Sequence, residues 1–250
     1  ILGAPDDLPA AANLLQSRWV SCLVDQRTRT TLTTRDLPAA DPDAGPTALF
    51  ASAGGARWLV VGGARFLIPA EQIEKTLLVD LGRGRTTSLP VPGTWLDLLP
   101  QGPALSLNVP HRGDPLTGPM SMSGKVDRIG RVIGAPDGSG HTIEYLVLAD
   151  GLVPLTPFAA EVYRAQEAEL SQPRSLQQSD VTAVPTSPQA TLVFPDAWPV
   201  AVPTITPGVP CAVLDTPAAN DRAATTRLLV LSPDSPFAAA PGTSSVVTVD

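Results

Sequence analysis

The chain has 250 residues, enough for one large or two small domains with a buried core. Its formal net charge of −7 gives no basic footprint for DNA, RNA or an anionic lipid surface, so we expect no nucleic-acid partner. Proline is frequent, with 28 residues, and aromatic residues make up only 4%. Because each proline fixes φ and removes a backbone donor, we expect short strands, many turns and few long helices.

The first elements surround a cysteine-containing strand. Residues 5–18 predict a short helix, since acidic residues and Pro9 precede an alanine-rich run. A strand follows at 19–25, then a threonine-rich, β-prone stretch at 28–36 and a loop at 36–46.

A strand–turn–strand–helix unit comes next. The stretch WLVVGGARFLIP, residues 58–69, predicts two strands around a glycine turn, and Pro69 suits the first turn of a helix over 71–78. Ile73 and Leu77 lie one turn apart on that helix. After it the chain returns to β and turn sequence, with a local apolar cluster at Trp95, Leu96, Leu98 and Leu99.

The same unit recurs about 87 residues later. The stretch YLVLADGLVPLT, residues 145–156, aligns with the first copy without a gap, and Asp-Gly between two apolar runs is a strong hairpin signal. Thr156 is a good helix N-cap and Pro157 suits the first helical position. Solenoids usually need three or more stacked copies, so we expect two small modules attached to a different, central β domain.

The last third combines polar and proline-rich segments with strands. Residues 171–190 are expected to be a polar connection. The run 193–214 carries a proline about every turn, which forbids a membrane helix, so we expect extended chain that wraps a surface. Three β candidates follow at 208–215, 225–232 and 244–250. The chain opens without a methionine or signal peptide, and we interpret it as a fragment whose anchor lies outside it.

The two cysteines, Cys22 and Cys211, each lie in a short apolar run. They are either two buried thiols, since free cysteine is among the most buried residue types, or one disulfide between the two ends of the chain. A bridge would close a loop of about 190 residues and stabilise the fold by up to about 5 kcal/mol in an oxidising compartment.

No catalytic motif emerges from the spacing. The nearest approach to a phosphate-binding loop, GPMSMSGKV at 118–126, has one residue too many between its glycines and lacks the hydroxyl that would bind Mg²⁺. Both histidines, His111 and His141, are at turns, and no zinc-binding spacing is present. The DGSG stretch at 137–140 lacks the later ligands of a calcium loop. We therefore expect no metal and no cofactor.

Four stretches carry a resemblance to a known family: ILGAPDDLP, WLVVGGARFLIP, the segment GKVDRIGRV leading into EYLVLADGLVPLTPFAAEVYRAQ, and GVPCAVLD. Their order is similar to the extracytoplasmic domain of the EccB family, a core membrane component of mycobacterial type VII (ESX) secretion systems. The resemblance implies an α+β, mainly β, elongated fold in which a central β domain carries small repeat modules. It also implies a disulfide between Cys22 and Cys211, and a transmembrane anchor outside this fragment.

On this resemblance we expect repeat modules at 47–101 and 133–176. The central β domain would then comprise residues 1–46, 102–132 and 177–250, with a truncated C-terminal end.

Three functions follow from the resemblance. The first is structural: the periplasmic domain supports assembly of the secretion complex, with other membrane components of that complex and further copies of itself as partners. Its interfaces would use exposed apolar side chains such as Trp95 or Trp198. The second is ATP hydrolysis, the family's usual description, which would require ATP and Mg²⁺ and a phosphate site around Lys125, Arg128 and Arg131. The third is binding to the cell wall, which would need exposed aromatic side chains on a module; Trp58 and Tyr145 are expected in the core.

Overall fold

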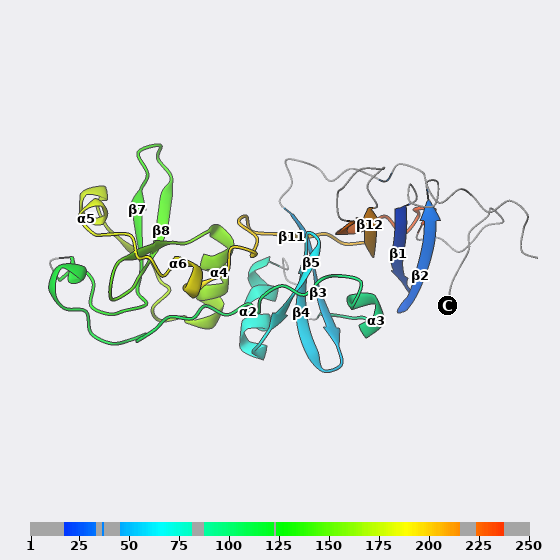
Figure 1. Cartoon of the computed structure of the whole chain (residues 1–250), viewed down its shortest axis with the longest axis horizontal. Coiled ribbons are helices and arrows are strands. Elements are labelled where there is room, and N and C mark those ends of the chain that lie inside the picture. The colour runs from blue at the N-terminus through cyan, green and yellow to red at the C-terminus, as the bar shows by residue number, and fades with distance from the viewer. Residues whose placement is uncertain are drawn as a thin grey trace, which may run out of the picture. The chain divides into compact units, whose positions relative to one another are not determined.

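The computed structural model describes residues 18–33, 37, 46–81, 88–122, 124–215 and 224–237. The described chain is built mainly from strands, with a few short helices, which confirms the expected α+β, mainly β class (Figure 1). It divides into two compact units. The first unit draws on residues 1–66, 88–101 and 204–250, and the second on residues 67–87 and 102–203. The predicted helix at 5–18 and strand at 244–250 lie outside the described residues, apart from Arg18.

A four-stranded antiparallel sheet in the first unit combines two early and two late strands of the described chain. Its order is β13-β12-β1-β2, formed by Thr225–Leu231, Val209–Asp215, Arg18–Val24 and Arg27–Thr33. The blue strands β1 and β2 therefore lie beside the orange β12 in Figure 1. Because side chains alternate along a strand, Val20 and Cys22 lie on one face of β1 and Trp19 and Ser21 on the other.

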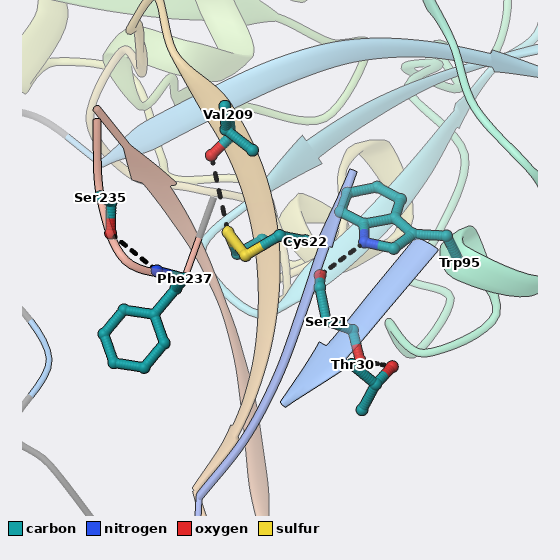
Figure 2. The surroundings of a disulfide bond; sticks show 8 residues. Ser21, Cys22, Thr30, Trp95, Val209, Ser235 and Phe237 are labelled. Carbon is teal, nitrogen blue, oxygen red and sulfur yellow. Dashed lines mark hydrogen bonds between the residues drawn. A yellow bond between two sulfur atoms is a disulfide. The ribbon is translucent and has the colours of Figure 1, made fainter. Parts of the chain in front are cut away.

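A disulfide between Cys22 and Cys211 links β1 to β12 (Figure 2). The two residues are directly opposite each other, with their Cα atoms 3.9 Å apart. Both are buried in an apolar cluster with Val20, Val213, Leu229 and Leu231. The disulfide is the one that the family resemblance implies, and it closes a loop between residues 189 positions apart.

The first repeat forms a second sheet, in the order β11-β3-β4-β5. These strands are Thr204–Ile205, Thr47–Ala53, Ala56–Val61 and Ala64–Ile68. The outer edge of β3 is covered at its start by β11 and towards its end by β6, Leu89–Pro90, both of them parallel to it. The short parallel strands thus prevent the edge of β3 from being open to another chain.

The second repeat forms the third sheet, in the order β10-β7-β8-β9. These strands are Arg174–Ser175, Val132–Pro136, Thr142–Val147 and Leu152–Pro154. A short segment around Thr186 runs parallel to the outer edge of β9. Each repeat is therefore three antiparallel strands followed by a helix, one strand more than the predicted strand–turn–strand–helix unit.

The helix of each repeat follows its last strand after a short break. In the second copy, α4 (Pro157–Gln166) starts as predicted, because Thr156 Oγ1 accepts a hydrogen bond from the Ala159 amide. In the first copy, α2 (Glu71–Leu81) begins where the predicted run 71–78 begins and extends three residues beyond it. The amide of Glu74 bonds to the carbonyl of Ala70, so Pro69 lies before the helix and not in its first turn. The two helices pack against each other within the second unit.

Two expectations for the last third are wrong in detail. The polar connection at 171–190 contains β10 and the helix α5 (Gln178–Thr182), whose start is stabilised by the Asp180 carboxylate on the Gln177 amide. The proline-rich run at 193–214 is not continuously extended: it begins at the end of α6 (Ala190–Val193) and makes a turn in which the Trp198 amide bonds to the Pro195 carbonyl, before the extended strands β11 and β12. The sequence did not indicate the short strands β10 and β11, because each pairs with a strand that is distant in sequence, β7 and β3 respectively.

Candidate interaction surface

An exposed apolar surface lies on one face of the β13-β12-β1-β2 sheet. Trp19 on β1 is 44% exposed and is directly opposite Leu32 on β2, which is 42% exposed. On its other side Trp19 is opposite Leu214 of β12. Leu98, 44% exposed, comes from the turn after α3 (Gly93–Leu96) and lines the same hollow of about 100 Å³ as Trp19 and Leu214. We call these four residues the Trp19 surface.

The alternation of β1 determines which of its side chains share the face of Trp19. Trp19 shares a face with Leu23, and Leu23 is buried in the cluster around Trp95 and Leu96. This face carries Trp19, Ser21 and Leu23 in turn; the cluster covers its Leu23 end, and its Trp19 end is exposed. Contiguous exposed apolar side chains that include an aromatic ring are typical of protein–protein contact sites.

The tryptophans that we predicted as interface candidates are instead in the core. Trp95 is 0% exposed, and its indole N–H donates a hydrogen bond of 2.8 Å to the Ser21 carbonyl (Figure 2). Trp198 is 4% exposed, stacks on Phe194 and meets the edge of Phe158. The tryptophan that is exposed, Trp19, was not selected from the sequence, since its alternating RWVSCLV context is equally compatible with a buried position.

Trp58 and Tyr145 occupy matching places in the two repeats and are half-buried against their own clusters. The guanidinium of Arg65 lies 5.2 Å from the centre of the Trp58 ring, in cation–π geometry. Both rings belong mainly to the packing of their modules, as expected.

The turn of each repeat hairpin is where a later segment of the chain docks. In the first copy, the Leu228 amide of β13 donates to the Gly62 carbonyl at 2.5 Å, and the backbone of Thr226 passes directly over Gly63. In the second, the Leu152 amide donates to the Pro185 carbonyl and the Ser187 amide donates to the Leu152 carbonyl, each at 2.9 Å. The repeated hairpin is thus a docking element for other parts of the fold.

The Asp150-Gly151 turn secures its segment with side chains as well. Ser187 Oγ donates to Asp150 Oδ1 at 2.8 Å, and Gln189 Nε2 donates to Asp150 Oδ2 at 2.7 Å. A Cβ atom on Gly151 would come within 2.6 Å of the Pro185 oxygen, so only glycine fits this approach.

The three cations that we considered for a phosphate site have partners within the chain. Lys125 Nζ donates to both carboxylate oxygens of Asp180, at 2.7 and 2.6 Å, and this bond lowers the pKa of Asp180. Arg128 donates to the Gly113 carbonyl, and Arg131 to the Glu169 carbonyl. A phosphate group at this place would have to compete with all three interactions.

The two histidines lie in polar turns. His111 Nδ1 is 3.5 Å from the Asp114 carboxylate, and His141 Nδ1 is 2.9 Å from Ser139 Oγ. Within the described ranges no three His, Cys, Asp or Glu side chains gather as a metal site would need. In the same ranges, no helix combines the length and the apolar character required to cross a membrane.

Comparison with known proteins gives a match over residues 1–249 to the family described as "Type VII secretion system ESX-1, transport TM domain B". Two curated relatives, both named "ESX-5 secretion system ATPase EccB5" and from two strains of Mycobacterium tuberculosis, are 32% identical over 137 residues. The match covers 53% of this chain and 26% of each relative, so it spans about a quarter of their length.

Solved structures share the fold. The chain is similar to one in the periplasmic assembly from the ESX-5 inner membrane complex, with a TM-score of 0.65 and 27% identity over 91% of this chain and 56% of that one. An intact ESX-5 inner membrane complex gives a TM-score of 0.64 and 26% identity, over 91% and 48% of the two chains. The structure of an EccB3 dimer from the ESX-3 core complex has the same fold at 23% identity, with a TM-score of 0.65 over 100% and 67%.

Proposed function

Since this chain belongs to the EccB family of type VII secretion components, we propose that it is an extracytoplasmic structural part of a secretion complex in the cell membrane. The observation that carries this proposal is the shared fold with the periplasmic assembly of an ESX-5 inner membrane complex. The disulfide between Cys22 and Cys211 agrees with an oxidising compartment outside the cytoplasm. In this role the chain supports assembly of the complex and so the export of proteins.

Residues 47–101 and 133–176 act in this proposal as two copies of one module, attached to a central β domain. The Trp19 surface is the contact site for other membrane components or for a second copy of the chain. An exposed tryptophan flanked by leucines is the kind of anchor that contributes most of the binding energy in protein interfaces.

The test uses the full-length protein in its own cell. Trp19→Ser combined with Leu32→Ser should reduce the amount of assembled membrane complex on native gels and the export that depends on it. Val79→Ser is the matched control, because Val79 is exposed but lies on α2, outside the Trp19 surface. Assembly and export at the wild-type level in the double variant, with the protein folded and present, would contradict the assignment of this surface.

ATP hydrolysis is the activity that the names of the curated relatives carry. For this chain it is the second candidate, and its phosphate site would be Lys125, Arg128 and Arg131. The measurement is Mg²⁺-dependent ATP turnover by the purified chain against an identically purified Lys125→Gln variant. Turnover that the variant loses would establish a hydrolase; we expect the same background from both, because Lys125 already binds Asp180.

Cell-wall binding is the third candidate, and sedimentation with purified peptidoglycan tests it. A glycan site on a module would need exposed aromatic rings, whereas Trp58 and Tyr145 are half-buried. We therefore expect the chain to stay in the supernatant.

A further inference from the structure

A second hollow, of about 290 Å³, lies within the second repeat between β8 and α4. Ile143, Leu155 and Ala160 contribute apolar lining, and Leu155 and Ala160 are buried. Its polar lining comes from Glu144 on β8 together with two residues of α4, Glu161 and Arg164. The hollow thus combines an apolar part with charged groups.

The three charged side chains form one cluster. Arg164 Nη1 is 3.0 Å from a Glu144 oxygen, and Arg164 Nη2 is 2.8 Å from a Glu161 oxygen. All three side chains are between 22% and 29% exposed, so water reaches them only in part. One guanidinium between two carboxylates leaves a net charge of −1, and a carboxylate can accept more hydrogen bonds than Arg164 supplies.

The first repeat has larger apolar residues at two positions that line this hollow in the second. By the alignment of the two copies, Ala160 corresponds to Ile73 and Arg164 to Leu77. Ile73 and Leu77 are both buried, with exposed fractions of 5% and 0%. The same alignment pairs Glu161 with the buried Glu74 and Glu144 with Arg57, so the second repeat differs here by a smaller apolar residue, by Arg164 and by a carboxylate at Glu144.

On the basis of the proposed function, we infer that this hollow between β8 and α4 binds an arginine or lysine side chain of another protein in the secretion complex. The aliphatic stem of such a residue would lie on Ile143 and Leu155, and its charged head would reach Glu144 and Glu161. The chain's net charge of −7 disfavours a second copy as the partner and favours a basic protein.

The test measures binding of a short probe by amide NMR on the whole chain. The tripeptide acetyl-Gly-Arg-Gly-amide should shift the amides of residues 142–144 and 160–164 at millimolar concentration. The same peptide with citrulline, which has the shape of arginine without its charge, should leave them in place. Added salt should weaken the arginine signal, because the cluster is partly exposed.

Two variants move the binding in opposite directions. Glu144→Gln with Glu161→Gln should abolish the arginine-dependent shifts. Arg164→Gln removes the resident cation, so the arginine peptide should bind several-fold more tightly than it binds the wild type. An unchanged indole signal from Trp198, which lies in the second unit and contacts Phe158 of α4, would show that each variant is folded.

Each opposite outcome overturns the inference. Equal shifts with citrulline would mean an apolar site without charge selection, and no shifts with either peptide would mean no site. Self-association of the wild type that the double glutamine variant loses would identify a second copy as the occupant. Loss of complex assembly on changing the Trp19 surface is measured separately, so the structural role could stand while this site fails.

Discussion

Gly63 and Gly151 lie in the corresponding turns of the two hairpins, and at each of them a single missing Cβ atom decides the packing. A Cβ on Gly63 would lie within 2 Å of the Thr226 oxygen, and one on Gly151 would be 2.6 Å from the Ser187 amide nitrogen. Tyr163 also makes a close contact with the backbone: it is 0% exposed, and its hydroxyl donates a hydrogen bond of 2.7 Å to the Gly130 carbonyl. These are backbone-to-backbone or hydroxyl-to-backbone contacts, which a larger or shorter side chain cannot replace.

Gly151→Ala should destabilise the chain by about 1–3 kcal/mol, the usual cost of inserting a methyl group into a packed site. The new Cβ would push away the segment that binds Leu152. Urea unfolding followed by circular dichroism measures the change. Gly93→Ala is the control, because a Cβ there would meet open space; equal effects of the two substitutions would show that the close approach is not what matters.

Tyr163→Phe should cost about 1–3 kcal/mol at pH 7, since the Gly130 carbonyl loses its partner in a buried place. Burial, with a contribution from the charge of Glu167, raises the pKa of Tyr163 above its ordinary value of 10.0. A raised pKa in the folded state means stability that is present below pH 10 and is lost as the pH rises further. The variant should lack this alkaline loss, and parallel curves of unfolding free energy against pH for the two proteins would refute the assignment.

At the scale of elements, each repeat is specified by neighbouring residues, whereas the segments that pack against it come from distant parts of the sequence. The two hairpins and their helices could be predicted because alternation, Asp-Gly and Thr-Pro signals lie within a dozen residues of one another. The short strands β6 and β11 could not, because each is two residues long and pairs only with the distant β3. The burial of Trp95 was missed for the same reason: its hydrogen-bond partner, Ser21, is 74 residues away.

The disulfide between β1 and β12 gives an element-scale prediction. Cys22→Ala with Cys211→Ala should lower the free energy of unfolding by about 2–5 kcal/mol, because the unfolded chain regains the freedom of a long loop. The sheet itself should remain, since β1 still pairs with both β2 and β12. Retained β-type circular dichroism with a lower urea midpoint is the expected result. Two alkylatable thiols in the native wild-type protein would contradict the pairing.

At the scale of the whole molecule, the chain consists of two compact units that differ in what stabilises them. The first contains the disulfide and the tryptophans Trp19, Trp58 and Trp95, and the second contains Trp198. The Trp19 surface belongs to the first unit, and the hollow beside Arg164 belongs to the second. The sequence indicated neither surface, because exposure depends on which segments cover a residue in the folded chain.

The two units should therefore respond separately to their own substitutions. The cysteine double variant should lower the unfolding midpoint that the indole amide signals of the first unit report and leave that of Trp198 unchanged. Gly151→Ala should do the opposite. Heating each variant while recording the four indole NMR signals makes the comparison, and equal shifts of all four signals in both variants would show one cooperative unit.

The pairing of β1 with β12 also sets an order of events for a chain that emerges from the ribosome, or from a membrane channel, with its N-terminus first. β1 and β2 can form a hairpin early, but an isolated hairpin is marginally stable in water. β12 and β13 begin about 190 and about 210 residues after β1, so the sheet that carries Trp19 and Leu32 stays incomplete while the whole second unit has already emerged and can fold. The apolar face of Trp19 and Leu32 is thus the part of the chain that stays exposed longest during synthesis, and a chaperone that protects the nascent chain would have to cover this face first.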